Sequence, residues 1–201
     1  MSAPLEFYFD FSSPYAYIGA MRIDELAARH GRQVDWRPML LGVALKVTGS
    51  QPLTGYPLKG QYSTHDFSRS AREHGIPFKM PTKFPLPTQA AARAVLWLKQ
   101  HDPAKAVPFA KAAYRAFFVD DKDISAPETV LDVAASLGVD RAALAAGIED
   151  PSIKNALREQ TEEAVHKRGV FGAPFVFVDG EPFWGADRFE MIDRWLTRGG
   201  W

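Results

Sequence analysis

The chain of 201 residues contains no cysteine. This absence excludes disulfide bonds, thiolate metal ligands, cysteine nucleophiles and every dithiol redox reaction that the protein could supply by itself. Any sulfur chemistry at this protein would therefore have to use a thiol that is bound from solution.

The chain also lacks an excess of charge of either sign, because 24 lysine and arginine residues balance 24 aspartate and glutamate residues. No net field attracts nucleic acid or an anionic membrane, and we expect neither as a partner. No apolar run is long enough to span a bilayer, and Met1–Pro4 lacks the regions of a secretory signal. The five histidines lack metal-ligand spacing. We therefore expect a cytoplasmic protein without a metal site.

A strand, a short turn and a helix are predicted at the start of the chain. An aromatic run from Phe7 ends at Asp10, and Ser13 and Pro14 then open a long amphipathic run that reaches His30. Ser13 is a good N-cap, and Pro14 suits the first helical position. A hydroxyl there faces the positive end of a helix, so Ser13 could help to hold an anion or could serve only as a cap.

The remaining pattern predicts two further groups of elements. The strand over 5–10, the helix over 14–30 and a strand over 34–37 form an economical parallel βαβ unit. A hairpin is predicted at Asp179-Gly180, and Pro182 places its second strand at a sheet edge. A helix over 187–197 closes the chain. Between these parts, helices are predicted at 58–74, 88–100, 103–118, 125–138, 140–146 and 151–167.

This order of elements predicts an α/β protein with a thioredoxin-like fold and a large α-helical insertion. The thioredoxin-like domain would be discontinuous, formed by residues 1–42 and 168–201, and residues 43–167 would form the inserted helical domain.

Three segments together resemble a known family. They are Phe-Tyr-Phe-Asp-Phe-Ser-Ser-Pro-Tyr over 7–15, Gly-Ser-Gln-Pro over 49–52 with Lys59 nearby, and Phe-Gly-Ala-Pro-Phe over 171–175 with Gly-Ala-Asp-Arg-Phe over 185–189. In this combination the chain resembles the 2-hydroxychromene-2-carboxylate isomerases and their kappa-class glutathione transferase relatives. These proteins belong to the DsbA-like branch of the thioredoxin superfamily, and the resemblance covers essentially the whole chain.

The resemblance implies that glutathione is the cofactor and that Ser13 is the catalytic residue. Ser13 takes the place of the first cysteine of a Cys-x-x-Cys pair, where it would hydrogen-bond the glutathione sulfur and favour the thiolate. Pro174 is implied to follow a cis peptide bond. Ala173 would then offer its backbone N–H and C=O groups to an extended ligand, as a neighbouring strand would.

The resemblance also implies four outer contacts to glutathione. Asp187 matches the acid that holds the γ-glutamyl end, and Ala186 replaces a small polar partner of that acid. Lys59 matches a lysine that approaches a carboxylate of glutathione or of the substrate. Ser50 stands where many relatives have asparagine and would contact the sulfur or the substrate. From the residues alone, Asp187 could instead cap the closing helix, and Lys59 could be a solvated surface lysine.

The implied function is glutathione-dependent isomerisation of a small-molecule, aromatic-derived substrate like 2-hydroxychromene-2-carboxylate. Alternatives are a kappa-type transferase that leaves glutathione on its electrophile, or a catalytically inactive glutathione-binding module, which Ser50 and Ala186 keep open. The resemblance also implies a homodimer. Four aromatic residues could frame an aromatic substrate or belong to the core: Tyr15, Tyr17, Phe84 and Trp184.

Overall fold

The structure, a computed structural model, describes residues 3–201 and contains a four-stranded mixed sheet in the order β2-β1-β3-β4. β1 (Leu5–Phe9) is parallel to β2 (Val34–Pro38) and antiparallel to β3 (Phe175–Val178). β4 (Glu181–Trp184) is antiparallel to β3 and forms one edge of the sheet. The parallel βαβ unit, the hairpin and the edge position of the strand that contains Pro182 are therefore confirmed.

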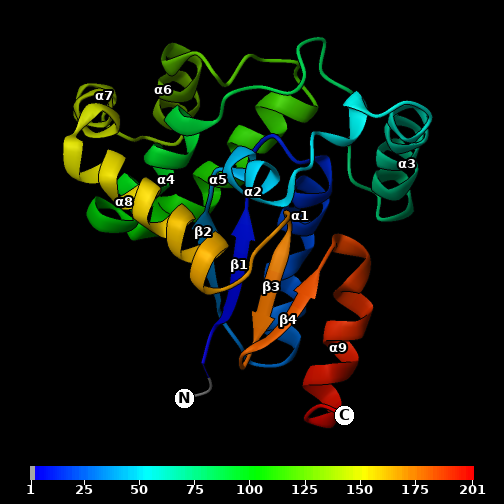
Figure 1. The fold of residues 1–201 in the computed structure, drawn as a ribbon. Helices are drawn as coiled ribbons and strands as arrows, with labels where there is room; N and C mark the ends of the chain where they lie inside the picture. The colour runs from blue at the N-terminus through cyan, green and yellow to red at the C-terminus, as the bar shows by residue number, and fades with distance from the viewer. Residues whose placement is uncertain (1–2) are drawn as a thin grey trace.

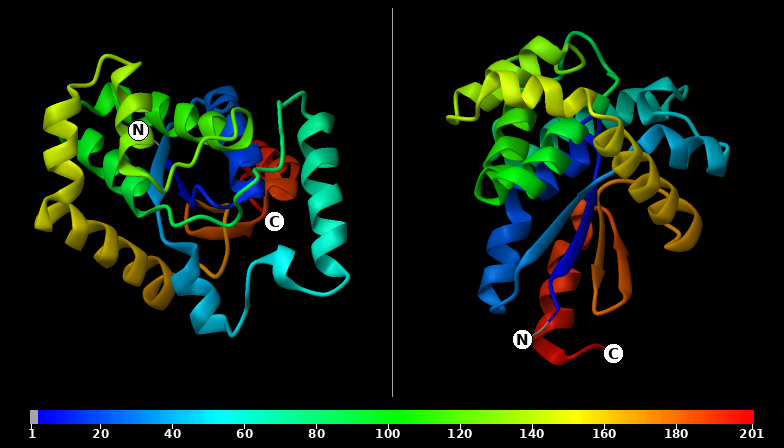
Figure 2. Two further views of the ribbon diagram at one scale, coloured as in Figure 1. Left: turned by 90° about the horizontal axis from the view of Figure 1, so that it is seen from above. Right: turned by 90° about the vertical axis from the view of Figure 1, so that its left-hand side faces the viewer.

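Helices surround this sheet and extend beyond one end of it (Figure 1). α1 packs against β1 and β2, and it also contacts α9, while α4 and α8 contact β2. Seen from above, α3 stands at the side of the molecule opposite α7 and α8 (Figure 2). The helices are α1 (Pro14–Arg29), α2 (Leu41–Thr48), α3 (Lys59–Glu73), α4 (Gln89–His101), α5 (Pro103–Phe118), α6 (Pro127–Ala135), α7 (Arg141–Glu149), α8 (Pro151–Glu162) and α9 (Phe189–Arg198).

The predicted thioredoxin-like α/β fold with a large helical part is confirmed, with two local differences. The helix predicted over 151–167 is α-helical only to Glu162 and continues as a π-helical turn over Glu163–Lys167. The closing helix is preceded by a 3₁₀ turn over Ala186–Arg188. The division into two domains stays a prediction. None of the helices in residues 3–201 is both long enough and apolar enough to cross a membrane.

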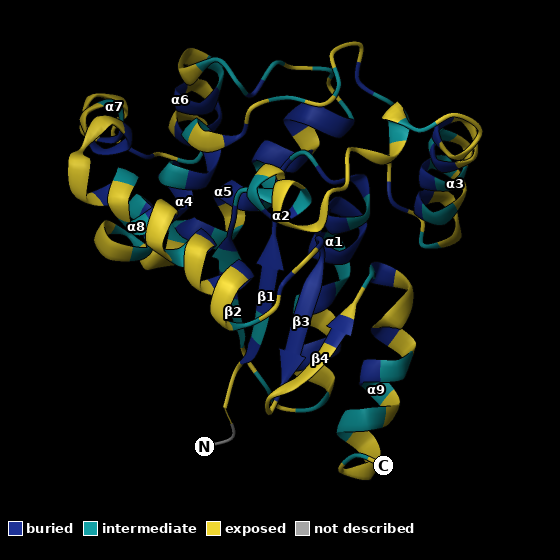
Figure 3. Ribbon diagram, viewed as in Figure 1, coloured by how far each residue is buried: buried dark blue, intermediate teal, exposed yellow. Residues whose placement is uncertain are grey.

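The central strand β1 belongs to two cores, because successive side chains of a strand point to opposite faces. Phe7 and Phe9 lie in the larger core, where the Phe9 ring centroid is 5.4 Å from that of Trp36. Tyr8 lies in a smaller core on the other face, with its ring centroid 5.9 Å from that of Phe177. Burial on both faces makes β1 and β3 the most enclosed part of the sheet (Figure 3).

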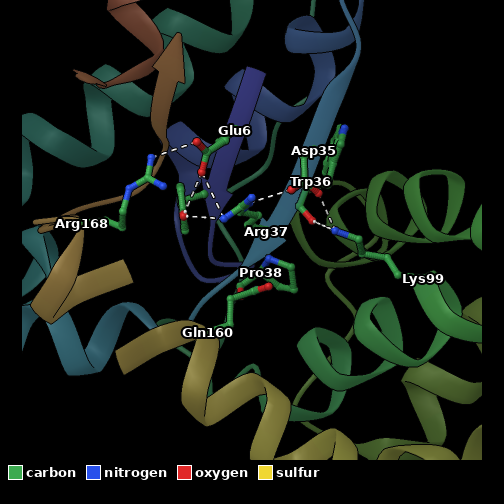
Figure 4. Close-up of polar contacts among 9 residues, drawn as sticks. Glu6, Asp35, Trp36, Arg37, Pro38, Lys99, Gln160 and Arg168 are labelled. Atoms are coloured by element: carbon green, nitrogen blue, oxygen red, sulfur yellow. Dashed lines mark hydrogen bonds and ion pairs between the residues drawn. The ribbon is translucent and has the colours of Figure 1, made fainter. Parts of the chain in front are cut away.

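A network of charged side chains joins β1 and β2 to the surrounding helices (Figure 4). Arg37 pairs with Asp35 at 2.7 Å and with Glu6 at 3.1 Å. Lys99 of α4 approaches Asp35 to 2.6 Å, and Arg168, which follows the π-helical turn, approaches Glu6 to 2.9 Å. Burial acts to raise the pKa of Asp35, but the bonds to Lys99 and Arg37 outweigh it and hold that pKa below its usual value.

Candidate active site

Ser13 lies at the N-cap of α1, where it connects the helix to the loop before β3. Its Oγ accepts a hydrogen bond from the Ala16 N–H at 3.1 Å and donates one to the Ala173 carbonyl at 2.8 Å. Pro14 occupies the first helical position. The cap predicted from the sequence is confirmed, and the Ser13 side chain has a long-range partner that local sequence rules do not reveal.

The peptide bond between Ala173 and Pro174 is cis, as the resemblance implied. The Pro174 carbonyl accepts a hydrogen bond from the Gly185 N–H at 3.0 Å, which joins this loop to the end of β4. The Pro174 ring packs behind Ala173 against Gly19 of α1, where an added Cβ would lie 3.3 Å from Pro174 Cγ. The glycine therefore lets α1 lie close to the loop that carries Ala173.

A cleft of about 1400 Å³ opens in front of Ser13. It is formed by the start of α1, α2 and the segment that follows it, α3, the segment before α4, and the loops on either side of the β3–β4 hairpin. Pro174 does not line it. Six of the residues singled out from the sequence do: Ser13, Ser50, Lys59, Ala173, Ala186 and Asp187.

Ser50 and Lys59 belong to the segment that leads into α3. Gly49 ends α2 in the left-handed conformation, and the exposed Ser50 follows it with its N–H donated to the Leu45 carbonyl. Lys59 is also exposed, and its Nζ lies 5.6 Å from the centre of the Tyr56 ring. Both side chains can therefore meet a ligand without breaking an ion pair.

Ala186 and Asp187 lie in the 3₁₀ turn before α9. Ala186 is buried, and its carbonyl accepts a hydrogen bond from Arg22 at 3.3 Å. Asp187 is exposed and pairs with the neighbouring Arg188 at 2.7 Å. The Asp187 carboxylate caps neither the 3₁₀ turn nor α9. Because Asp187 also lines the cleft, a cationic group of a ligand there can join or replace Arg188 as its partner.

Tyr15 and α3 are joined by a contact that the sequence analysis did not identify. The Tyr15 hydroxyl donates a hydrogen bond to Asp66 at 2.6 Å, and Arg69 pairs with the same carboxylate. Burial and the adjacent Asp66 carboxylate raise the pKa of Tyr15 well above its usual range, so the phenol stays protonated. Asp66 and Arg69 are three positions apart on the polar face of α3, and this spacing was the feature of the sequence that could have indicated the pair. The contact fixes α3 as a wall of the cleft.

Asp10 is a second residue whose importance the sequence analysis missed. Its buried carboxylate accepts hydrogen bonds from the Ser12 N–H at 2.8 Å, the Leu41 N–H at 2.7 Å and the Thr88 hydroxyl at 2.9 Å. Burial raises the pKa of Asp10, although these donors act in the opposite direction. The position of an acidic residue directly after a buried aromatic strand was the feature of the sequence that could have indicated this role. Asp10 holds together three segments that surround the cleft.

The four aromatic residues with two possible roles divide between cleft and core. Tyr15, Phe84 and Trp184 line the cleft, whereas Tyr17 is fully buried in the core. The Trp184 side chain lies over Gly172, where an added Cβ would be 2.3 Å from the indole nitrogen. Three aromatic side chains from separate parts of the chain therefore line the cleft. Within residues 3–201, no group of three or more histidine, aspartate or glutamate side chains is arranged to hold a metal ion.

Comparison with known proteins gives consistent matches along the chain. A model of the DSBA-like thioredoxin domain family matches residues 4–197. The 2-hydroxychromene-2-carboxylate isomerase of Sphingobium xenophagum is 29% identical over 198 residues, covering 98% of this chain and 99% of that protein. Glutathione S-transferase kappa 1 of Rattus norvegicus is 26% identical over 209 residues, covering 96% of this chain and 92% of that protein. A solved structure of 2-hydroxychromene-2-carboxylate isomerase superposes with a TM-score of 0.87 at 25% identity, covering 96% and 94%.

Proposed function

This chain belongs to the DSBA-like thioredoxin domain family, and we propose that it is a glutathione-dependent isomerase of aromatic catabolic intermediates like 2-hydroxychromene-2-carboxylate. One observation carries the proposal. In a chain without cysteine, Ser13 stands at the start of α1 and donates a hydrogen bond to the Ala173 carbonyl at 2.8 Å, and both residues line a large cleft. The relatives named as isomerases and kappa transferases support a reaction that uses glutathione.

In this proposal the protein binds glutathione along the cleft. Ala173 pairs with the backbone of the cysteinyl residue, while Asp187 receives the ammonium of the γ-glutamyl end and Lys59 a carboxylate. Ser50 contacts the sulfur or the substrate. A free thiol has a pKa of about 8.5 and is mostly protonated at neutral pH. A hydrogen bond from Ser13 to the sulfur would lower that pKa and increase the nucleophilic fraction.

The reaction conserves glutathione. When bound, glutathione would supply a thiolate that adds reversibly to the conjugated substrate while the ring C–O bond breaks. Rotation about the former double bond and elimination of the thiolate would then give the trans product. The protein contributes placement and electrostatic stabilisation. The aromatic side chains of Tyr15, Phe84 and Trp184, which line the cleft, suit a substrate of this class.

Replacing Ser13 by alanine tests the proposal. A hydrogen bond to a charged group contributes about 1.5–3 kcal/mol, so the turnover number should fall about 10- to 150-fold. Glutathione affinity should change little. Asp140→Ala is a matched control, because Asp140 caps α7 through the Ala143 N–H far from the cleft. Equal activity of Ser13→Ala and wild type would contradict the assigned role.

The product assay separates this proposal from a kappa-type transferase. An isomerised substrate with an unchanged amount of total glutathione indicates an isomerase, whereas stoichiometric loss of glutathione indicates a transferase. We further propose that the protein is a cytoplasmic homodimer. Light scattering of the purified chain tests its oligomeric state, and a single-chain mass would contradict the dimer.

A further inference from the structure

The Ser13 hydroxyl has no proton free for a ligand. A serine hydroxyl has one hydrogen to donate and two lone pairs that can accept. The hydrogen is donated to the Ala173 carbonyl at 2.8 Å, and one lone pair accepts from the Ala16 N–H at 3.1 Å. Ser13 is only 4% exposed, so water does not compete freely for these bonds. One lone pair of Ser13 remains.

This arrangement favours the protonated form of a bound thiol over the thiolate that the reaction needs. The remaining lone pair of Ser13 can accept a hydrogen bond from an S–H group, but it cannot donate one to a thiolate. Ser13 stabilises a thiolate only if its O–H turns away from Ala173. That rotation would leave the carbonyl of Ala173, a residue only 8% exposed, without its donor within the protein, which opposes the rotation.

The peptide group of Ala173 shows which donor could replace the Ser13 hydroxyl at the Ala173 carbonyl. The Ala173 N–H has no acceptor among residues 3–201, and Ala173 is only two residues before β3. A ligand residue that pairs with Ala173 as in an antiparallel sheet would accept from this N–H and donate its own N–H to the Ala173 carbonyl. Such a ligand satisfies the carbonyl that Ser13 must release.

We propose that thiol activation in this protein is an exchange of hydrogen bonds at the Ala173 carbonyl. The N–H of the ligand's thiol-bearing residue takes over the carbonyl, and the Ser13 O–H turns to the sulfur. The thiol proton leaves to water. This inference rests on the proposed use of glutathione. It adds that the protein activates only thiols that carry an adjacent peptide N–H. Small thiols without that group would bind as protonated thiols.

The first test compares glutathione with an analogue in which an ester oxygen replaces the cysteinyl N–H. The pKa of each bound thiol is measured from the ultraviolet absorbance of the thiolate as a function of pH, at saturating ligand. Glutathione should show a pKa about 1–2 units below its free value, which corresponds to one hydrogen bond to a charged atom. The ester analogue and 3-mercaptopropionate should keep their free values. An equal lowering for glutathione and the ester analogue would overturn the exchange.

The second test measures binding where the thiol is protonated, at about pH 6, well below its pKa of about 8.5. In Ser13→Ala the Ala173 carbonyl has no competing donor, so glutathione should bind as tightly as to wild type or up to about tenfold more tightly. A purely structural role of Ser13 predicts weaker binding instead, which would count against the exchange. The cap variant Asp140→Ala should bind glutathione like wild type.

The two tests separate this inference from the proposed function. A wild-type protein that fails to bind glutathione in calorimetry refutes both. A wild-type protein that binds and turns over with glutathione, yet lowers the pKa of glutathione and of the ester analogue equally, refutes the exchange and leaves the proposed function in place.

Discussion

Replacing Asp10 by alanine should destabilise the protein and disturb the cleft, because one carboxylate joins three segments of its wall. Asp10 accepts from the N–H of Ser12, just before Ser13, and from the N–H of Leu41, at the start of α2. It also accepts from the hydroxyl of Thr88, at the start of α4. Loss of the carboxylate leaves these three donors without their partner.

The expected magnitude follows from two opposing contributions. Removal of the acceptor leaves three donors without a partner, and a buried unpaired donor costs about 1–3 kcal/mol, so the three together cost about 3–9 kcal/mol. Burying the carboxylate of Asp10 costs several kcal/mol, in agreement with the direction in which burial moves its pKa. The net loss should be about 3 kcal/mol. Domains commonly have about 5–15 kcal/mol of stability, so the variant should fold with a much lower midpoint of unfolding.

Urea unfolding followed by circular dichroism at neutral pH measures this loss. Thr88→Val is the matched control, because it removes one of the three donors and should cost about 1–2 kcal/mol. In the double variant Asp10→Ala/Thr88→Val the two losses should overlap by about 1–2 kcal/mol, since both remove the same hydrogen bond. Additive losses, or a loss below about 1 kcal/mol for Asp10→Ala, would refute this account of the carboxylate.

Three further predictions concern packing, charge and specificity. Gly147→Ala should lower the free energy of unfolding in urea by about 1–3 kcal/mol, because the added Cβ would lie 2.2 Å from a ring carbon of Trp97. The control Gly42→Ala, whose Cβ would have no atom within 4 Å, should not lower it. Because its pKa is lowered, ionised Asp35 stabilises the fold above the usual aspartate pKa of 3.8. The difference in free energy of unfolding between wild type and Asp35→Asn should therefore shrink as the pH falls below that value. A difference that does not change with pH would contradict this role of Asp35. Trp184→Leu should raise the KM for an aromatic substrate about 2- to 10-fold without changing the Kd for glutathione, and an equal change in both would show a general disruption.

Elements specified by local chemistry were predictable from the sequence. Ser13 and Pro14 start α1 because a capping hydroxyl and a fixed φ act within one turn. Asp179 and Gly180 form the hairpin turn because both adopt positive φ, at 51° and 91°. The placement of Ser50, Lys59 and Asp187 in the same cleft as Ser13 was available only through the family resemblance, since long stretches of chain separate these residues.

Contacts that depend on tertiary packing were not predictable. Asp66 belongs to a polar stretch of α3 that the sequence alone does not connect to Tyr15, yet it accepts a hydrogen bond from that residue, 51 positions earlier in the chain. The bond between Asp10 and Thr88 spans 78 positions. The cis bond before Pro85 had no local signal in the sequence either. For the two hydrogen bonds, the packing of α1, α3, α4 and β1 determines which polar side chains meet, and a hydrophobic pattern does not specify that pairing.

The geometry in front of Ser13 depends largely on backbone groups, and this limits what side-chain substitution can reveal about the site. Both hydrogen-bond partners of the Ser13 hydroxyl are backbone atoms, the Ala173 carbonyl and the Ala16 N–H. Ala173 and Ala186 can offer a ligand only their peptide groups and apolar methyl contact. Their positions follow from residues that need not touch a ligand, such as Gly19, whose missing Cβ lets Pro174 pack against α1. Ser13 can be tested by mutation, whereas the contribution of the Ala173 peptide is accessible through ligands that lack the matching N–H.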